Sequence, residues 1–149
     1  MNKFSFLSLG LACVVSTAGL ADSVVGQWSI VGFSGEPWYV EAQELIGKNQ
    51  TFQGGFSEGP FYGCNYSGQS MTYTAYSNDE FFANPEFALF LSLREGMILS
   101  SERLFVHRIT CNGNGNMGSR RVLYPFVTNE ARASAWYLFE GGVFSFYRP

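Results

Sequence analysis

The sequence predicts an all-β domain with minor α content, folded as an antiparallel barrel of about eight strands with one or two short helices. Aromatic residues make up 17% of the 149 residues and charged residues only 14%, a balance typical of strand-rich domains. Short stretches that alternate apolar and polar residues follow one another, and 17 Gly supply the turns between them. About eight strands can close a sheet around an interior that side chains fill or that holds one small ligand.

The first predicted strand covers residues 24–33. Trp28 and Ile30 share one face of it, because successive side chains of a strand point to opposite faces. A turn then leads to a short predicted helix over residues 38–46, and Gly47 stands where such a helix ends. Trp28 is therefore the large side chain that we expect to close one end of the barrel.

The next region predicts one weak strand and one hairpin. The weak strand covers residues 48–56, where a pair of glycines favours a bulge or bend. Residues 57–60 are predicted to form a turn. Residues 61–66 and 69–77 then alternate about a Ser-Gly pair and predict the hairpin.

The stretch from 85 to 94 permits two interpretations. Asn84 before Pro85 is a good helix start, and Gly96 is a plausible stop. Alternating apolar residues would instead suit a strand: Phe87, Leu89, Leu91 and Leu93. We favour the helix. Its apolar surface continues nearly all round, so we expect it to be buried and to cap a barrel mouth.

The C-terminal part predicts the remaining strands, at residues 97–111, 119–127, 135–139 and 143–148. In the first of them, Phe105, His107 and Ile109 share one face. A loop rich in Asn and Gly follows at 112–116, a turn covers 128–134, and the last two strands form a hairpin through residues 140–142.

The N-terminus predicts a signal peptide over residues 1–21. Lys3 precedes an uncharged apolar run, and small residues end it, which places cleavage between Ala21 and Asp22. A membrane anchor is the first alternative, but a run of about 17 residues diluted by Ser and Thr is at the lower limit for a spanning helix. Lipidation at Cys13 is the second. We expect a periplasmic or secreted protein whose single barrel domain covers 22–149, with no transmembrane segment after processing.

Cleavage would leave two cysteines, Cys64 and Cys111. An even pair in an exported chain predicts a disulfide, and two buried thiols are the alternative. A metal site is disfavoured because His107 is the only histidine that could join them. We expect no cofactor. The formal net charge of −3 argues against nucleic acid, which needs a basic face, and permits a basic partner.

Two resemblances add expectations. Gly26-Gln27-Trp28 on the first strand, together with Arg148 at the chain end, resembles the Gly-x-Trp and late Arg of calycin (lipocalin-like) barrels. That resemblance implies a cation–π contact in which Arg148 packs across Trp28 and closes the barrel. The stretch Gly63-Cys64-Asn65 is similar to META-type domains of bacterial envelope lipoproteins, and the chain also looks like small exported proteobacterial proteins. This last likeness rests on Leu45-Ile46-Gly47-Lys48, the two cysteines and Glu140-Gly141-Gly142-Val143-Phe144, and it implies a compartment and not an activity.

Catalytic chemistry has little support in the sequence. His107 lies between Phe105 and Ile109 on one strand face, which favours a packed histidine over a general base. A Ser–His–acid triad is not excluded by counting, but no nucleophile-elbow pattern surrounds a serine. Several loop acids could be paired as in glycosidases, and solvated carboxylates are the usual explanation. We therefore expect a protein that is not an enzyme.

The function expected is that of an exported binding module, which inhibits an envelope-targeting enzyme such as a lysozyme or a protease. Its partner loops would be 57–60, 78–84 and 112–118, with these contact residues: Glu58, Asp79, Glu80 and Asn114. The alternative is a carrier of a small apolar ligand inside the barrel, lined by Tyr73, Phe105, Tyr124 and Phe126.

Overall fold

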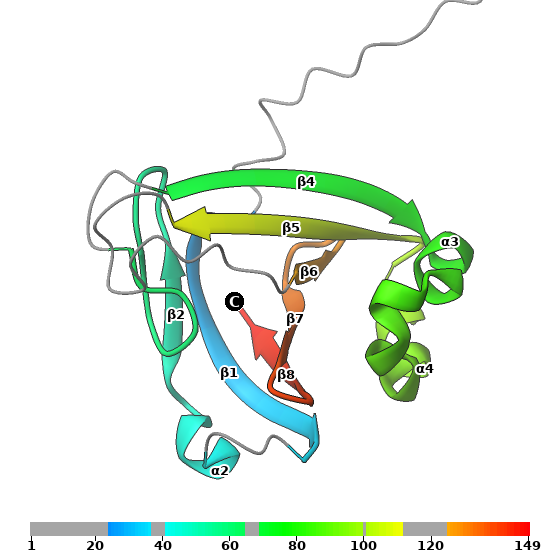
Figure 1. Cartoon of the computed structure of the whole chain (residues 1–149), viewed down its shortest axis with the longest axis horizontal. Helices are drawn as coiled ribbons and strands as arrows, with labels where there is room; N and C mark the ends of the chain where they lie inside the picture. Colours follow the sequence, from blue (N-terminus) through cyan, green and yellow to red (C-terminus); the bar gives the residue numbers. More distant parts are fainter. Residues whose placement is uncertain (1–23, 37–40, 65–68, 100, 112–124) are drawn as a thin grey trace, which may run out of the picture.

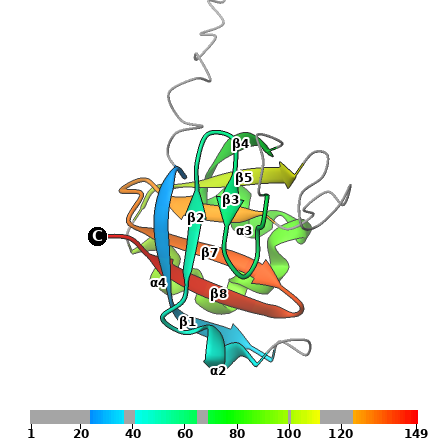
Figure 2. The same cartoon turned by 90° about the vertical axis from the view of Figure 1, so that its left-hand side faces the viewer.

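The computed structural model describes residues 24–36, 41–64, 69–99, 101–111 and 125–149. Within them, eight antiparallel strands form one sheet in the order β3-β2-β1-β8-β7-β6-β5-β4, a nearly closed barrel (Figures 1 and 2). The strands are β1 (Gly26–Gly35), β2 (Asn49–Phe52), β3 (Ser57–Glu58), β4 (Gln69–Ser77), β5 (Arg103–Cys111), β6 (Phe126–Asn129), β7 (Ser134–Phe139) and β8 (Gly142–Tyr147). The helices are α2 (Ala42–Leu45), α3 (Asn78–Ala83), the 3₁₀ helix η1 (Pro85–Leu93) and α4 (Arg94–Ile98). The predicted fold class is confirmed.

Strand β1 has the alternation that the sequence predicts. Trp28 and Ile30 are buried, whereas Val31 is 55% exposed. The strand pairs with β2 along its first half and with β8 along its second half, and the register shifts between Ile30 and Gly32. This irregularity bends β1 so that it can pair with two different strands at a barrel corner (Figure 1).

Both faces of β5 to β8 are buried. The inner face contributes Phe126, Tyr137 and Phe144 to the barrel core. The outer face of the same strands contributes a second cluster, which includes Val127 and Trp136 and packs against α3, η1 and α4. Figure 1 shows these helices beside the barrel. The expectation that the helical segment caps a barrel mouth is therefore wrong, because the outer face of the sheet is itself apolar and needs a cover.

The hairpin predicted from residues 61–66 and 69–77 is wrong. Strand β4 pairs instead with β5 along its whole length, from Gln69 opposite Cys111 to Ser77 opposite Arg103. Phe61 and Tyr62 are consecutive and both buried, which a strand with one solvent face does not allow. Both rings enter the barrel core, and the described part of this stretch makes an isolated bridge to β3.

Several predicted boundaries shift. The weak strand divides at its glycine pair into β2 and β3, so residues 57 and 58 belong to a strand and not to a turn. Residues 97 and 98 belong to α4, so β5 begins later than predicted. The predicted turn at 128–134 is shorter, because β6 runs to Asn129 and β7 starts at Ser134.

The last hairpin, β7–β8, is confirmed. Phe139 pairs with Gly142, and the two residues between them, Glu140 and Gly141, have φ of 50° and 84°. Positive φ at both central positions belongs to the tight turn whose twist matches that of the flanking strands.

The stretch at 85–94 is helical, as favoured, but its geometry differs from the expected one. It is a 3₁₀ helix with a bend at Phe87. Side chains three positions apart share a face of such a helix, so Phe87 and Phe90 are buried together. Leu89 and Leu91 are 54% and 48% exposed, so the expectation of burial all round is wrong.

Some predictions lie outside the described residues. They are the signal peptide and its cleavage site, the start of the helix at 38–40, the strand end at 65–66 with the hairpin turn at 67–68, the loop at 112–118 and the strand portion at 119–124. Among the helices that the structure describes, none has the length and apolar character needed to cross a membrane.

Candidate functional site

The barrel interior holds three of the four predicted ligand-lining residues, and it is crossed by aromatic rings. Tyr73, His107, Phe126, Tyr137 and Phe144 occupy successive register positions of β4, β5, β6, β7 and β8. The Phe126 ring lies 5.1 to 5.5 Å, centroid to centroid, from three others: Trp28, Phe52 and Phe146. The contacts of Phe126 are thus made by the protein's own core.

The structure brings Tyr73 and Phe105 together, since their ring centroids are 6.3 Å apart on β4 and β5. Tyr73 is half-buried and Phe105 is buried. Tyr124, the fourth residue predicted to line a ligand site, lies outside the described residues. The three placed residues therefore share the inner face, and one of them is fully enclosed by core rings.

His107 is enclosed in the same interior. Its Nε2 atom lies 2.9 Å from the Thr128 Oγ1 atom, and the residue is 1% exposed. Burial lowers the pKa of His107 to about 4, and the positive charges of Arg132 and Arg148 add to this effect. The imidazole is therefore neutral at neutral pH, which suits a packed core residue.

Arg148 packs over Trp28 at one end of the sheet. The guanidinium carbon lies 4.3 Å from the centre of the Trp28 ring, which is the contact that the calycin resemblance implies. Arg148 also donates from Nη1 to the Val25 carbonyl at 2.7 Å and from Nε to the Arg132 carbonyl at 2.9 Å. A Cβ atom at Gly26 would lie 3.3 Å from Nη1, so this glycine admits the guanidinium.

The predicted partner residues Asp79 and Glu80 lie together in the first turn of α3. Ser77 caps this helix: its Oγ accepts from the Glu80 amide, and the Glu80 carboxylate accepts from the Ser77 amide at 2.9 Å. These hydrogen bonds lower the pKa of Glu80. The Asp79 side chain is 97% exposed. The sequence signal was a capping box, Ser-x-x-Glu at 77–80, which our sequence analysis overlooked.

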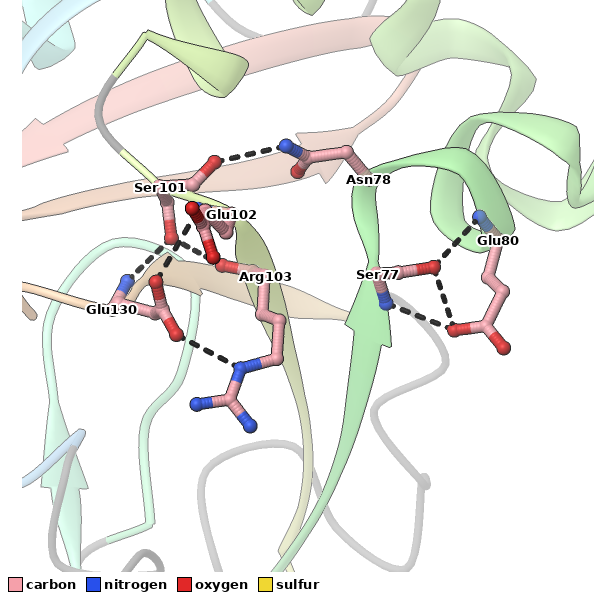
Figure 3. A network of polar contacts seen from close by, with 7 residues as sticks. All are labelled: Ser77, Asn78, Glu80, Ser101, Glu102, Arg103 and Glu130. Atoms are coloured by element: carbon pink, nitrogen blue, oxygen red, sulfur yellow. Dashed lines mark hydrogen bonds and ion pairs between the residues drawn. The ribbon is translucent and has the colours of Figure 1, made fainter.

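A network of polar contacts holds α3 in place (Figure 3). Asn78 donates from Nδ2 to the Ser101 carbonyl at 2.9 Å, and the Glu130 amide donates to the Ser101 hydroxyl at 2.9 Å. The Glu130 carboxylate accepts from Arg103 Nε at 2.8 Å and from the Glu102 amide. The network therefore ties the start of α3 to the start of β5 and to the β6–β7 turn.

The helical segment 78–99 carries much of the chain's charge asymmetry. It has four acids and one base, Arg94, so its formal net charge equals the −3 of the whole chain. Arg94 lies 5.4 Å from the centre of the Phe82 ring and 3.8 Å from Asp79. The one cation of the segment is thus engaged by the segment itself.

Glu58, the third predicted partner residue, does not join this surface. Glu58 lies on β3 beside β2, on the side of the barrel away from α3 (Figure 1). Asn114 lies outside the described residues.

The sheet edges β3 and β4 approach each other near Cys64. Cys64 is buried and exchanges both backbone hydrogen bonds with Ser57. Gln69, which faces Cys111 in the β4–β5 register, donates from Nε2 to the carbonyls of Gln53 and Phe56 at 2.7 and 3.2 Å. The Gln69 side chain therefore links the strand partner of Cys111 to the β2–β3 turn, and Ser57, the backbone partner of Cys64, follows that turn.

In the part of the chain that the structure describes, no group of three or more His, Cys, Asp or Glu side chains is placed to hold a metal ion. Comparison with known proteins found no matching family model, no similar curated protein and no similar solved structure.

Proposed function

We propose that this protein is an exported, periplasmic binding module without catalytic activity, which inhibits an envelope-targeting enzyme such as a lysozyme or a protease. The observation that carries the proposal is the acidic α3 surface, fixed to two other parts of the barrel by the Asn78–Ser101–Glu130 network. A surface that is held rigid before binding loses little conformational entropy when it meets a partner.

The charge of this surface selects the class of partner. Asp79 and Glu80 are exposed at the start of α3, and Glu95 is exposed on α4. A patch of one sign attracts a partner of the opposite sign and raises the rate of encounter. A basic enzyme is therefore the expected target.

Export and a Cys64–Cys111 disulfide belong to the same proposal. The apolar leader with its small-residue end supports export. The meeting of the β4 start with the β2–β3 turn supports the disulfide, because it links the strand partner of Cys111 to the turn that precedes Ser57, the backbone partner of Cys64. We do not propose the carrier function, because the contacts of Phe126 are made by core rings.

The test measures inhibition. Purified protein is mixed with a panel of basic lysozymes and envelope proteases, and the rate of each enzyme is followed at low and high salt. We expect one of them to be inhibited, and more strongly at low salt. Asp79→Asn/Glu95→Gln should weaken this inhibition, whereas the control Glu41→Gln/Glu44→Gln, which removes two exposed acids near α2, should not. Unchanged rates across the panel would end the inhibitor proposal.

A further inference from the structure

We infer that the exposed apolar residues Leu89, Leu91, Ile98 and Leu99, on η1 and at the end of α4, anchor the partner, and that the partner presents a basic amphipathic segment, with apolar side chains between Lys or Arg. This inference rests on the proposed binding function and adds to it the contact residues and the chemistry of the bound segment.

The 3₁₀ geometry places two leucines outside. Phe87, Phe90 and Leu93 recur every three residues and form the row that faces the sheet, with the two Phe fully buried. Leu89 and Leu91 belong to the other two rows, and the part of the chain that the structure describes leaves both exposed. An α-helix of the same sequence would not sort its leucines in this way.

The following helix extends the apolar surface. Met97 is the buried residue of α4, whereas Ile98 is 37% and Leu99 is 87% exposed. Leu89 and Leu91 of η1 therefore lie within ten residues of Ile98 and Leu99 in the same helical segment, and all four are exposed. Isolated exposed apolar residues are ordinary, but four within one short helical segment make a patch of the kind that marks interaction sites.

The charges around these leucines are acidic. Glu95 is exposed on α4, between Leu91 and Leu99 in the chain, and neither Glu95 nor Glu102 forms an ion pair with another described residue. Arg94 is engaged by Asp79 and the Phe82 ring. An anionic membrane or an acidic peptide would be repelled here, so charge complementarity leaves a basic occupant.

Apolar anchors inside a charged rim are the usual anatomy of a protein interface. The central anchors supply most of the affinity, and the rim supplies rate and selectivity. A helical segment with leucines on one face and lysines on the opposite face would fill the patch. The lysine ammonium groups would then lie beside Glu95 and the residues next to it.

The experiment uses the purified protein, produced with export, and two synthetic helical peptides as probes. One is an amphipathic peptide of Leu and Lys, and the other has Glu in place of every Lys. The protein variants are Leu91→Ser/Leu99→Ser and the control Val31→Ser, which alters a 55% exposed residue on strand β1. Kd is measured by calorimetry, and urea unfolding checks that each variant is folded.

We expect the Leu/Lys peptide to bind and the Leu/Glu peptide to bind far more weakly. The double leucine variant should weaken Lys-peptide binding about tenfold or more, and Val31→Ser should leave it unchanged. Equal affinity of the double variant, equal affinity for both peptides, or binding to anionic vesicles without binding to the Lys peptide would each overturn the inference.

The enzyme panel separates the two proposals. If the double leucine variant inhibits an enzyme as well as the wild type does, the result supports the binding function and contradicts the role of the leucines as anchors. If the Lys peptide binds through the leucines while no enzyme is inhibited, the anchor stands and the inhibitor proposal falls.

Discussion

The imidazole of His107 sits among aromatic rings in the barrel, hydrogen-bonded to Thr128, and its pKa is lowered to about 4 from 6.5. The unfolded chain takes up a proton near pH 6.5, whereas the folded protein takes it up only near pH 4. Stability is therefore present in full above pH 6.5 and is lost as pH falls toward 4. We predict a loss of at most about 3 kcal/mol, measured by urea unfolding at pH 7 and pH 4.

His107→Gln is the control for this pH dependence. A glutamine can still bond to Thr128 but does not titrate, so its stability should fall less between pH 7 and pH 4. Glu80 and Glu130 also have lowered pKa values and lose stabilising contacts in acid, but they do so in both proteins. An equal loss in the wild type and in His107→Gln would contradict the assignment to the histidine.

Arg148 is the second residue whose contacts lead to a measurable effect. It stacks on Trp28 and donates to two backbone carbonyls, so Arg148→Ala removes a cation–π contact and leaves the Val25 and Arg132 carbonyls without this donor. We predict a loss of about 2 to 4 kcal/mol in the free energy of unfolding. Arg148→Lys should recover part of it, because it keeps the charge without the planar fork.

The matched control is Arg94→Ala. Arg94 also lies over a ring, that of Phe82, but its side chain is half exposed and its ion pair with Asp79 is long. A loss below about 1 kcal/mol is expected there. Equal losses at the two arginines would show that Arg148 does not close the barrel.

At the scale of elements, the sequence pattern predicted those strands and turns in which burial follows the periodicity of the local sequence. Strand β1 and the β7–β8 hairpin alternate or turn as their sequences require. The stretch at 61–64 could not be predicted, because its backbone is satisfied by a side chain from elsewhere. Gln50 is fully buried and bonds through both amide atoms to the backbone of residues 58, 61 and 62.

That arrangement makes Gln50 a sensitive position. Gln50→Met keeps the size of the side chain but leaves four backbone groups of the facing segment without these hydrogen bonds. We predict a loss of about 3 to 5 kcal/mol in urea unfolding. The same substitution at Gln43, which is exposed on α2, should be close to neutral. A mild effect at Gln50 would mean that residues 58–62 are held by their rings alone.

At the scale of the molecule, the barrel followed from the sequence pattern and the Trp28–Arg148 contact from the calycin resemblance, but the place of the helices followed from neither. Strands β6 and β7 are buried almost throughout, which implies a cover on the outer face as well as a core inside. The apolar residues in these two strands were the sequence feature that indicated this outer cover. The exposed leucines could not be foreseen, because the choice of a 3₁₀ over an α-helix depends on packing of Phe87 and Phe90 against that outer face.

The proposed disulfide belongs to the whole molecule because it would join the two edges of the sheet. Cys64 is bonded to β3, and Cys111 lies opposite the first residue of β4, whose Gln69 side chain already reaches the β2–β3 turn. A bridge there would pin the one place where the barrel is not closed by strand pairing. Because the crosslink would also close a long loop in the unfolded chain, we predict that Cys64→Ser/Cys111→Ser lowers stability by about 4 kcal/mol.

Reductant provides the control for this prediction. Urea unfolding of the wild type should shift to lower urea when a thiol reductant is added, whereas the double serine variant should unfold at the same urea concentration with and without it. Alkylation in denaturant followed by mass spectrometry counts the thiols, and the oxidised wild type should take up no label at Cys64 or Cys111. Full labelling of both cysteines before reduction would show that they form no disulfide. The hydrogen bonds of Gln69 and of the Ser57–Cys64 bridge would then be the described contacts that hold the two edges together.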